Sequence, residues 1–142
     1  MGKHRPKKIG ISYGAWDFCH AGHCLHFEEC KKHCDYLIVG LQIDPSKDRA
    51  DKNKPIMSIE ERYIMLRGNR NVDAILLYES EKEVRKLDRW LGDVRFMGRD
   101  HWIKCLKRKH HPIKAKVIYT SRNHGYSSSE LRKRTYEHYL QS

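Results

Sequence analysis

Two histidines flank a glycine in the segment His20-Ala21-Gly22-His23. Residues three apart lie on the same side of a helix, so one helical turn would bring both imidazoles to a helix start. The free N–H groups and the positive dipole end of such a start favour a phosphate, and Gly22 allows the backbone to approach it closely. Imidazoles placed there would hydrogen-bond phosphoryl oxygens as negative charge develops on them. The segment predicts a phosphate-transfer site, with a pair of surface histidines as the alternative.

A second polar segment, nearer the carboxyl end of the chain, suits the same ligand. Ser127, Ser128 and Ser129 precede Glu130, so hydroxyls and free backbone N–H groups meet at a second helix start. Arg122 carries a planar, permanently charged group that matches phosphate oxygens. An ordinary helix N-cap is the alternative, and it would need only one serine. Two phosphate-ready helix starts predict a ligand with several phosphates, and a nucleoside triphosphate is the first candidate.

Other charged side chains are candidates with simpler alternatives. Lys47, Lys52 and Lys54 lie in one polar stretch and could hold a phosphate, or form a solvated surface. Asp17 and Asp100 each follow a predicted strand, where they could ligate Mg²⁺ together with phosphate oxygens or contact the nucleoside. Asp17 could instead cap the following helix.

The chain holds five cysteines, most of them close to histidines, as in the group Cys30, His33 and Cys34. A zinc site is the chemical alternative for such a cluster. No Cys-x-x-Cys pair is present, however, and the two histidines of the first segment fit a phosphate better. We therefore expect no protein-held metal centre, and reduced thiols that pack as small hydrophobic groups.

The elements that must position these residues alternate between strands and helices. Such alternation predicts βαβ units, and with them a single Rossmann-like α/β domain with a five-stranded, mostly parallel sheet flanked by helices. Ligands bind beyond the carboxyl ends of the strands in such sheets. Apolar runs predict strands at 8–13, 36–42, 72–78, 94–97 and 115–119, loops at 14–22 and 44–55, and helices at 24–33, 58–70, 81–91, 101–109 and 128–140.

Length and charge limit the class of protein. The 142 residues fit one domain, which we place over 1–142. Twenty-nine basic and 18 acidic residues give a net charge of +11, which attracts polyanions such as nucleic acid, anionic membranes or small phosphorylated substrates. No apolar run approaches the roughly 20 residues of a membrane span, and the basic N-terminus lacks the apolar core of a signal peptide. We expect a cytoplasmic protein that does not associate with membranes.

Four segments, taken in order, resemble the cytidylyltransferases of the HxGH nucleotidyltransferase superfamily, and most of all those that act on glycerol 3-phosphate. The resemblance extends from Ile9 to about Arg134. Its segments are the HxGH motif at 20–23, Ser58–Arg62 with Arg70–Asp73, Met97–Trp102 as M-G-x-D-x-W, and Arg122–Ser129 as R-x-x-G-[IY]-S-[ST]-[ST].

The resemblance implies transfer of CMP from CTP to a small phosphorylated alcohol, with glycerol 3-phosphate as first choice and pyrophosphate as product. It also implies Mg²⁺ bound with the CTP triphosphate, direct attack without a covalent enzyme intermediate, and a homodimer. It assigns catalysis to His20, His23 and Arg122, nucleotide binding to Tyr13, Gly14, Ala15, Trp16, Asp17, Gly22, Asp100, Trp102, Tyr126, Ser127, Ser128 and Ser129, and acceptor binding to Lys47, Lys52, Lys54 and Arg70.

Two alternatives stay open. Related proteins with the same two motifs transfer AMP from ATP to a different phosphorylated acceptor. The other alternative is a non-catalytic, basic nucleic-acid-binding module, which would interleave aromatic and basic residues on one face. Lys104–His111 is the only such stretch, with Trp102 as its one neighbouring aromatic. The intact HxGH and serine segments speak against this module.

Overall fold

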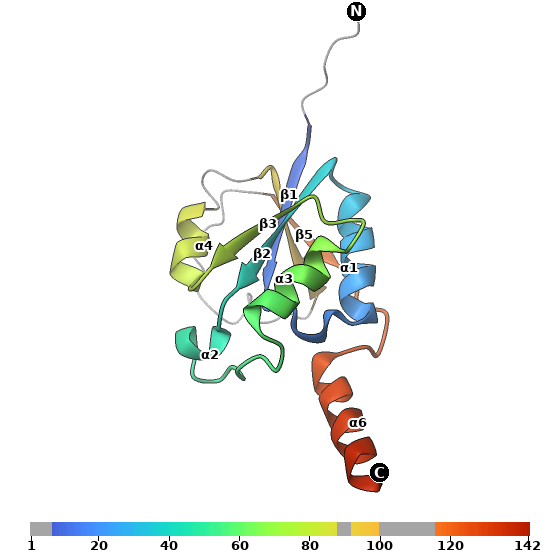
Figure 1. The fold of residues 1–142 in the computed structure, drawn as a ribbon. Coiled ribbons are helices and arrows are strands. Elements are labelled where there is room, and N and C mark those ends of the chain that lie inside the picture. The colour runs from blue at the N-terminus through green and yellow to red at the C-terminus, as the bar shows by residue number, and fades with distance from the viewer. Residues whose placement is uncertain (1–6, 88–91, 100–115) are drawn as a thin grey trace, which may run out of the picture.

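The computed structural model describes residues 7–87, 92–99 and 116–142 (Figure 1). Its strands are β1 (Ile9–Gly14), β2 (Tyr36–Gln42), β3 (Ala74–Tyr78), β4 (Val94–Gly98) and β5 (Lys116–Thr120). Its helices are α1 (Ala21–Lys31), α2 (Pro45–Asp48), α3 (Ile59–Arg67), α4 (Glu81–Leu87) and α6 (Ser128–Gln141), with a 3₁₀ turn, η1, over Asp17–Cys19.

The five strands form one sheet in the order β3-β2-β1-β4-β5, and all four neighbouring pairs are parallel. The predicted Rossmann-like α/β fold is thereby confirmed. The strand order reverses at β1, because the chain continues to β2 on one side of it and β4 pairs on the other. Ligands of open α/β sheets bind beyond the carboxyl end of the strands at such a reversal. The connection from β1 to α1 is therefore where the fold places a site.

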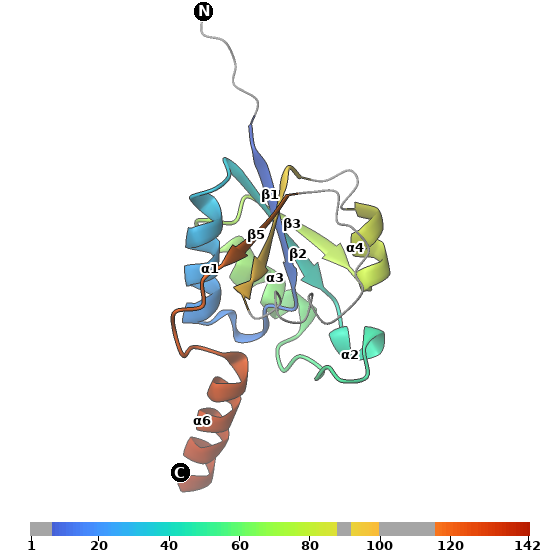
Figure 2. The same cartoon turned by 180° about the vertical axis from the view of Figure 1, so that it is seen from behind.

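The core lies between the sheet and the two helices α1 and α3, which cover the same face of the sheet (Figures 1 and 2). Leu37, Val39 and Leu41 of β2 are fully buried, as the continuous apolar run of this strand predicts. Phe27 of α1 and Leu66 of α3 pack in the same cluster. This packing fixes the start of α1 relative to the carboxyl ends of the strands.

The start of α1 differs from the prediction by three residues. His20 is the N-cap, and its Nδ1 accepts a hydrogen bond from the backbone N–H of Gly22 at 3.0 Å. Helix N-caps are more often Ser, Thr, Asp or Asn, so a histidine at position 20 gave no capping signal, and Asp17, the one candidate cap, lies in the preceding 3₁₀ turn. The whole HxGH segment consequently forms the first turn of the helix.

The start of α3 is as predicted. Ser58 caps the helix and, together with Glu61, forms a reciprocal capping box. The helix ends at Arg67, three residues earlier than expected, with Gly68 as its C-cap. Between 44 and 55, where a loop was expected, Asp44 caps the short helix α2, and a proline occupies its first turn.

Cys30 and Cys34 are buried free thiols, as expected, whereas Cys19 and Cys24 are half-buried. The last helix, α6, extends away from the rest of the molecule and has no buried residue (Figure 1). The predicted helix at 101–109 and the basic stretch within it lie outside the described residues. Within the described ranges, no helix has both the length and the apolar composition needed to cross a bilayer.

Candidate functional site

His20 and His23 lie side by side just beyond β1, as the sequence predicts. Their rings stack with a centroid distance of 3.7 Å and an interplanar angle of 24°. The hydrogen bond from Gly22 N–H to His20 Nδ1 leaves the proton of a neutral His20 ring on Nε2. His23 Nδ1 is buried and has no hydrogen-bond partner among the described residues. The pair forms a compact imidazole surface at the start of α1.

Both rings are neutral at neutral pH. Burial, reinforced by the neighbouring His20, lowers the pKa of His23 to about 3. Burial also lowers the pKa of His20, and the positive groups of His124 and Arg122 contribute to the same shift. A neutral imidazole still donates one hydrogen bond, so the pair can contact phosphoryl oxygens while Arg122 supplies positive charge.

These shifts predict a loss of stability in mild acid. Between about pH 6.5 and pH 3 the unfolded chain binds a proton at His23 that the folded chain does not bind. The free energy of unfolding must therefore fall as the pH is lowered through this range. We expect the Tm to drop from pH 7 to pH 5, and to drop less in His23→Gln, where position 23 does not titrate.

Thermal unfolding followed by circular dichroism at half-unit pH steps provides the measurement. His33→Gln, which removes an exposed histidine at the other end of α1, is the matched control. If the Tm depends on pH equally in the wild type and in His23→Gln, the lowered pKa of His23 is not the cause of the loss of stability.

Trp16 packs against the histidine pair through its contact with His23. Its indole N–H donates to the carbonyl oxygen of Gly40 at 2.9 Å, and its side chain is only 8% exposed. The ring meets His23 edge-on at 5.2 Å and Phe27 at 4.8 Å. The indole therefore lies in the core beside His23, and the nucleotide contact expected of Trp16 stays a prediction.

The connection between β1 and α1 is strained. Trp16, Phe18 and Cys19 have φ angles of 54°, 67° and 34°, the left-handed region that side chains other than glycine rarely occupy. Such conformations cost roughly 1–3 kcal/mol each and persist only where surrounding contacts hold them. One such contact is the hydrogen bond from Phe18 N–H to the Met57 sulfur at 3.1 Å.

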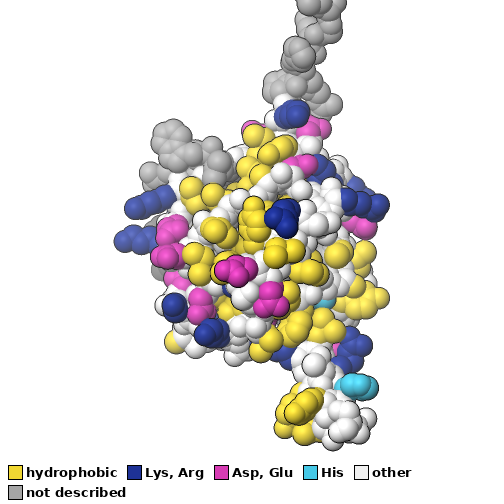
Figure 3. Space-filling model, in the orientation of Figure 1, with side chains coloured by type: hydrophobic (Ala, Val, Ile, Leu, Met, Phe, Trp, Pro, Cys, Tyr) yellow, Lys and Arg dark blue, Asp and Glu magenta, His cyan; other side chains and the backbone are white. Residues whose placement is uncertain are grey.

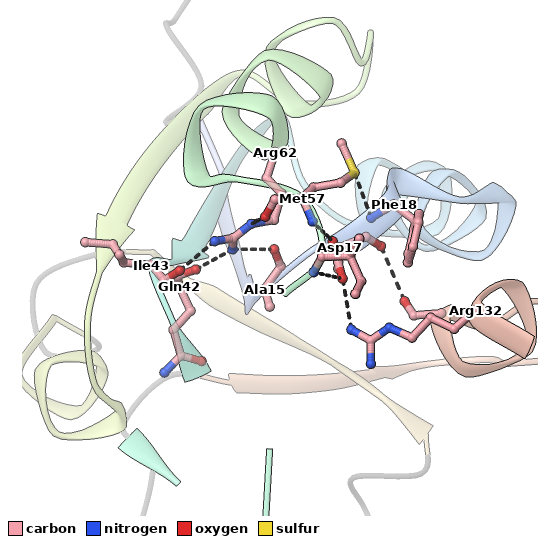
Figure 4. Close-up of polar contacts among 10 residues, drawn as sticks. Ala15, Asp17, Phe18, Gln42, Ile43, Met57, Arg62 and Arg132 are labelled. Carbon is pink, nitrogen blue, oxygen red and sulfur yellow. Dashed lines mark hydrogen bonds and ion pairs between the residues drawn. The ribbon is translucent and has the colours of Figure 1, made fainter. Parts of the chain in front are cut away.

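Asp17 is the central contact of this connection (Figure 4). Its carboxylate accepts hydrogen bonds from the backbone N–H groups of Ile56 at 2.8 Å and Met57 at 3.0 Å. It also forms an ion pair with Arg132 of α6 at 2.9 Å. Burial opposes ionisation of Asp17, but these donors outweigh it and lower its pKa. Both oxygens thus accept hydrogen bonds from the chain's own groups, and the expected Mg²⁺ ligand or nucleoside contact of Asp17 stays a prediction.

Arg62 of α3 ties three backbone segments together, and its side chain is almost fully buried (Figure 4). Its guanidinium donates to the carbonyl oxygens of Ala15 at 3.0 Å, Gln42 at 2.6 Å, Ile43 at 2.5 Å and Met57 at 3.1 Å. These carbonyls follow β1, end β2 and precede α3. In the sequence Arg62 stands out only as part of a family segment, because its four partners are distant or local carbonyls that no pattern marks.

The serine segment divides into different roles. Ser127 is the N-cap of α6, where its Oγ accepts from Glu130 N–H at 3.1 Å, so the capping alternative describes this residue. Ser128 donates from Oγ to the backbone oxygen of Asp17 at 3.3 Å. Ser129 is exposed. The contact of Ser128 brings the start of α6 to the connection that precedes α1, so the two predicted phosphate-binding helix starts do meet.

The remaining candidates are divided between the carboxyl ends and the amino ends of the strands. Lys47, Lys52 and Lys54 follow β2, as the histidines follow β1, so both sets lie beyond the carboxyl ends of the parallel strands. Arg70 precedes β3, at the opposite edge, where its side chain is 83% exposed and 3.4 Å from Glu28. The structure does not bring Arg70 to the histidines, because the parallel sheet separates strand starts from strand ends.

The other nucleotide-binding candidates are placed as follows. Tyr13, Gly14 and Ala15 are at the end of β1, next to the histidines. Tyr126 is 54% exposed, in the connection between β5 and α6. Asp100 and Trp102 lie outside the described residues. Among the residues that are described, no three or more His, Cys, Asp or Glu side chains are grouped to hold a metal ion.

Residues 11–134 match the model of the cytidylyltransferase-like family. The chain belongs to this family. The match covers most of the predicted domain and includes both helix starts of the site. It confirms the superfamily expected from the HxGH segment.

Curated relatives of this cytidylyltransferase-like chain include the bifunctional protein HldE from two bacteria. The Haemophilus ducreyi protein is 33% identical over 100 residues, which cover 70% of this chain and 21% of the relative. The Campylobacter jejuni subsp. doylei protein is 28% identical over 130 residues, covering 91% of this chain and 28% of the relative. The chain thus spans between a fifth and a third of the length of these relatives. They do not single out the glycerol 3-phosphate type.

Solved structures share the fold of this cytidylyltransferase-like chain. A lipopolysaccharide core biosynthesis protein from Thermoplasma volcanium superposes with a TM-score of 0.65 at 23% identity, covering 82% of this chain and 98% of the other. A structure from Vibrio parahaemolyticus, described as a nicotinate-nucleotide adenylyltransferase, gives 0.59 at 14% identity, covering 93% and 88%. At these identities the likeness supports the fold alone.

Proposed function

We propose that this cytidylyltransferase-like chain transfers CMP from CTP to a small phosphorylated alcohol, with glycerol 3-phosphate as the first choice, and releases pyrophosphate. The observation that carries the proposal is the meeting of two helix starts around a stacked, neutral histidine pair. The start of α6 reaches the connection before α1 through Ser128 and Arg132. The positive ends of two helix dipoles at one place suit a chain of phosphates.

In this reaction a phosphate oxygen of the acceptor attacks the α-phosphorus of CTP. A new P–O bond forms while the bond from the α-phosphorus to the bridging oxygen breaks, and that electron pair leaves with pyrophosphate. The attacking phosphate is already largely ionised near pH 7, since its second pKa is about 6, so no general base is needed. Catalysis then consists of positioning and of charge stabilisation.

The side chains divide this work by position. The histidine pair donates hydrogen bonds to the α-phosphate oxygens, where negative charge changes most during transfer. Arg122 and the start of α6 hold the phosphates that leave as pyrophosphate. The lysines that follow β2 lie at the same edge and are proposed to hold the acceptor phosphate. Mg²⁺ enters as part of the nucleotide complex, where it neutralises phosphate charge, with phosphate oxygens and water as its ligands.

Pyrophosphate release tests the proposal directly. The protein is incubated with Mg²⁺ and one of CTP, ATP, GTP or UTP, with and without glycerol 3-phosphate, ethanolamine phosphate or choline phosphate. We expect release only with CTP and only when an acceptor is present. A thermal-shift series with the same nucleotides reports binding independently, since a ligand that binds only the folded chain raises its Tm.

Each other outcome of this assay has a definite meaning. Release with ATP and not with CTP would replace cytidylyl by adenylyl transfer. Tight, salt-sensitive binding of nucleic acid, with no pyrophosphate from any nucleotide, would support the binding-module alternative instead.

Ser128→Ala tests the contribution of the α6 start to turnover. We expect the single-turnover rate to fall at least about tenfold, because a hydroxyl donor near the leaving phosphates is lost. Ser127→Ala is the comparison: it removes a helix cap, which costs about 1 kcal/mol of helix stability, and should change the rate less. Rate and melting temperature are measured on the same preparations. A Ser128→Ala protein with a lower Tm and an unchanged rate would assign the segment to capping alone.

We also propose a homodimer, as the family resemblance implies. An apolar surface over α3 and the edge strand β3 supports it, since large exposed apolar patches mark interfaces (Figure 3). Its apolar members are Ile59, Tyr63, Ile64 and Leu77. Light scattering should give twice the chain mass, and Ile64→Glu should reduce it to one chain. The cytoplasmic location stays a prediction.

A further inference from the structure

His124, in the connection between β5 and α6, packs against the HxGH segment. A Cβ added to Gly22 would lie 2.8 Å from Cε1 of His124 and 2.9 Å from Cε1 of His20. Both imidazoles therefore reach the same point beside the start of α1. Cε1 lies between the two nitrogens of an imidazole, so both rings bring their nitrogen-bearing side to this place, with His20 Nδ1 at 3.0 Å from it. This contact also explains why position 22 is a glycine.

A local hydrogen bond fixes the proton of a neutral His124. Its Nδ1 accepts from the backbone N–H of Tyr126 at 3.2 Å, so its proton is on Nε2. His20 makes the same kind of bond, accepting from the amide two residues later in the chain. The ring of His124 is also stacked on Tyr126 at 5.4 Å with an interplanar angle of 25°. Two imidazoles with Nε2–H donors thus flank one helix start.

The surroundings of His124 favour an anion. The start of α1 and Arg122 are positive, and Arg122 contributes to the lowered pKa of His20. The nearby carboxylates already have partners. Glu29 accepts from Ser121 N–H at 3.0 Å and from the Ser121 hydroxyl at 3.2 Å, and Asp17 is paired with Arg132.

We propose that His124 is a third phosphate-binding imidazole of this site, which donates from Nε2 to the phosphates that leave as pyrophosphate. The proposal rests on the proposed function and extends it to a residue that the motif does not specify. The pattern Arg-x-x-Gly leaves position 124 open, so its residue type carries no signal in the sequence. Only the contact with Gly22, a hundred residues earlier, places it in the site.

Two substitutions at position 124 test the proposal in the full chain. His124→Phe keeps an aromatic ring for the stack with Tyr126 but removes the donor, whereas His124→Gln restores an N–H donor. The probe is pyrophosphate itself, with its Kd measured by titration calorimetry in the presence of Mg²⁺. KM and kcat for the nucleotide used by the wild type are measured alongside. His138→Phe, at an exposed histidine of α6, is the matched control.

We expect His124→Phe to weaken pyrophosphate binding and to raise KM, each by on the order of tenfold, as befits one lost hydrogen bond to a charged group. His124→Gln should recover most of both losses, and the Tm of both variants should stay within a few degrees of the wild type. The control should resemble the wild type throughout.

The outcomes separate this proposal from the one on which it rests. Unchanged pyrophosphate affinity in His124→Phe, in a protein whose wild type turns over, would overturn the role of His124 and leave the proposed function intact. Equal losses in His124→Phe and His124→Gln, with a lowered Tm, would assign the residue to packing and overturn it as well. A wild type that binds neither pyrophosphate nor any nucleotide contradicts both proposals.

Discussion

His23→Gln is expected to lower kcat by on the order of 100-fold while weakening CTP binding much less. The imidazole of His23 is stacked on His20 and held by Trp16, so its position is fixed before the substrate arrives. A preorganised donor acts mainly on charge that develops in the transition state, and its loss therefore affects the chemical step more than binding. Single-turnover rates at saturating CTP, together with the Kd of CTP, separate the two effects.

His33→Gln, the control of the pH experiment, serves here as well, because it removes a histidine just after α1 without touching the HxGH segment. Its ring lies 6.4 Å from Phe96, at the end of the helix that is far from the HxGH segment. The control should retain the wild-type rate. Near-normal turnover in His23→Gln would show that this histidine has a structural role and does not act in catalysis.

Arg62→Met should cost several kcal/mol of unfolding free energy, because each buried polar group that loses its partner costs about 1–3 kcal/mol. The guanidinium supplies donors to four backbone carbonyls, and methionine supplies none. Buried carbonyls without a donor pay their full desolvation cost. Urea unfolding followed by circular dichroism measures the change as a lower midpoint at an unchanged slope.

Two further variants keep the Arg62 experiment informative. Arg67→Met changes an exposed arginine on the same helix and should shift the midpoint little. Arg62→Lys retains the charge but cannot reach four carbonyls at once, so its loss should fall between those of the other two. Equal midpoints for Arg62→Met and Arg67→Met would show that the buried guanidinium does not stabilise the fold.

Much of the fold follows from local patterns in the sequence. The apolar runs predict all five strands, and Ser58 followed by the acidic Glu60 and Glu61 predicts the start of α3. The exact ends of the helices depend on the capping groups at their termini. The α1 prediction began late because a histidine side chain, acting through Nδ1, does what a serine or aspartate usually does. The α3 prediction ran past Gly68, although a glycine after an amphipathic stretch is a common stop signal.

The candidate site was less completely predictable, because its supports are contacts between distant residues. His20 and His23 share one helical turn, so their spacing predicts their proximity. The ion pair of Asp17 with Arg132 joins residues 115 positions apart, and no local pattern marks it. The same limit holds for Trp16, whose burial depends on a left-handed turn and on contacts with Gly40 and Phe27 that no local pattern marks.

The link between Asp17 and Arg132 also sets when the site can form during synthesis. The chain emerges from the ribosome with its amino end first, so β1 and α1 are available long before α6. The start of α6 can join them only after more than a hundred further residues have been added, and closing so long a loop costs entropy that must be recovered by the packing of the sheet. The start of α6 can therefore reach the histidine pair only after α6 itself has been synthesised.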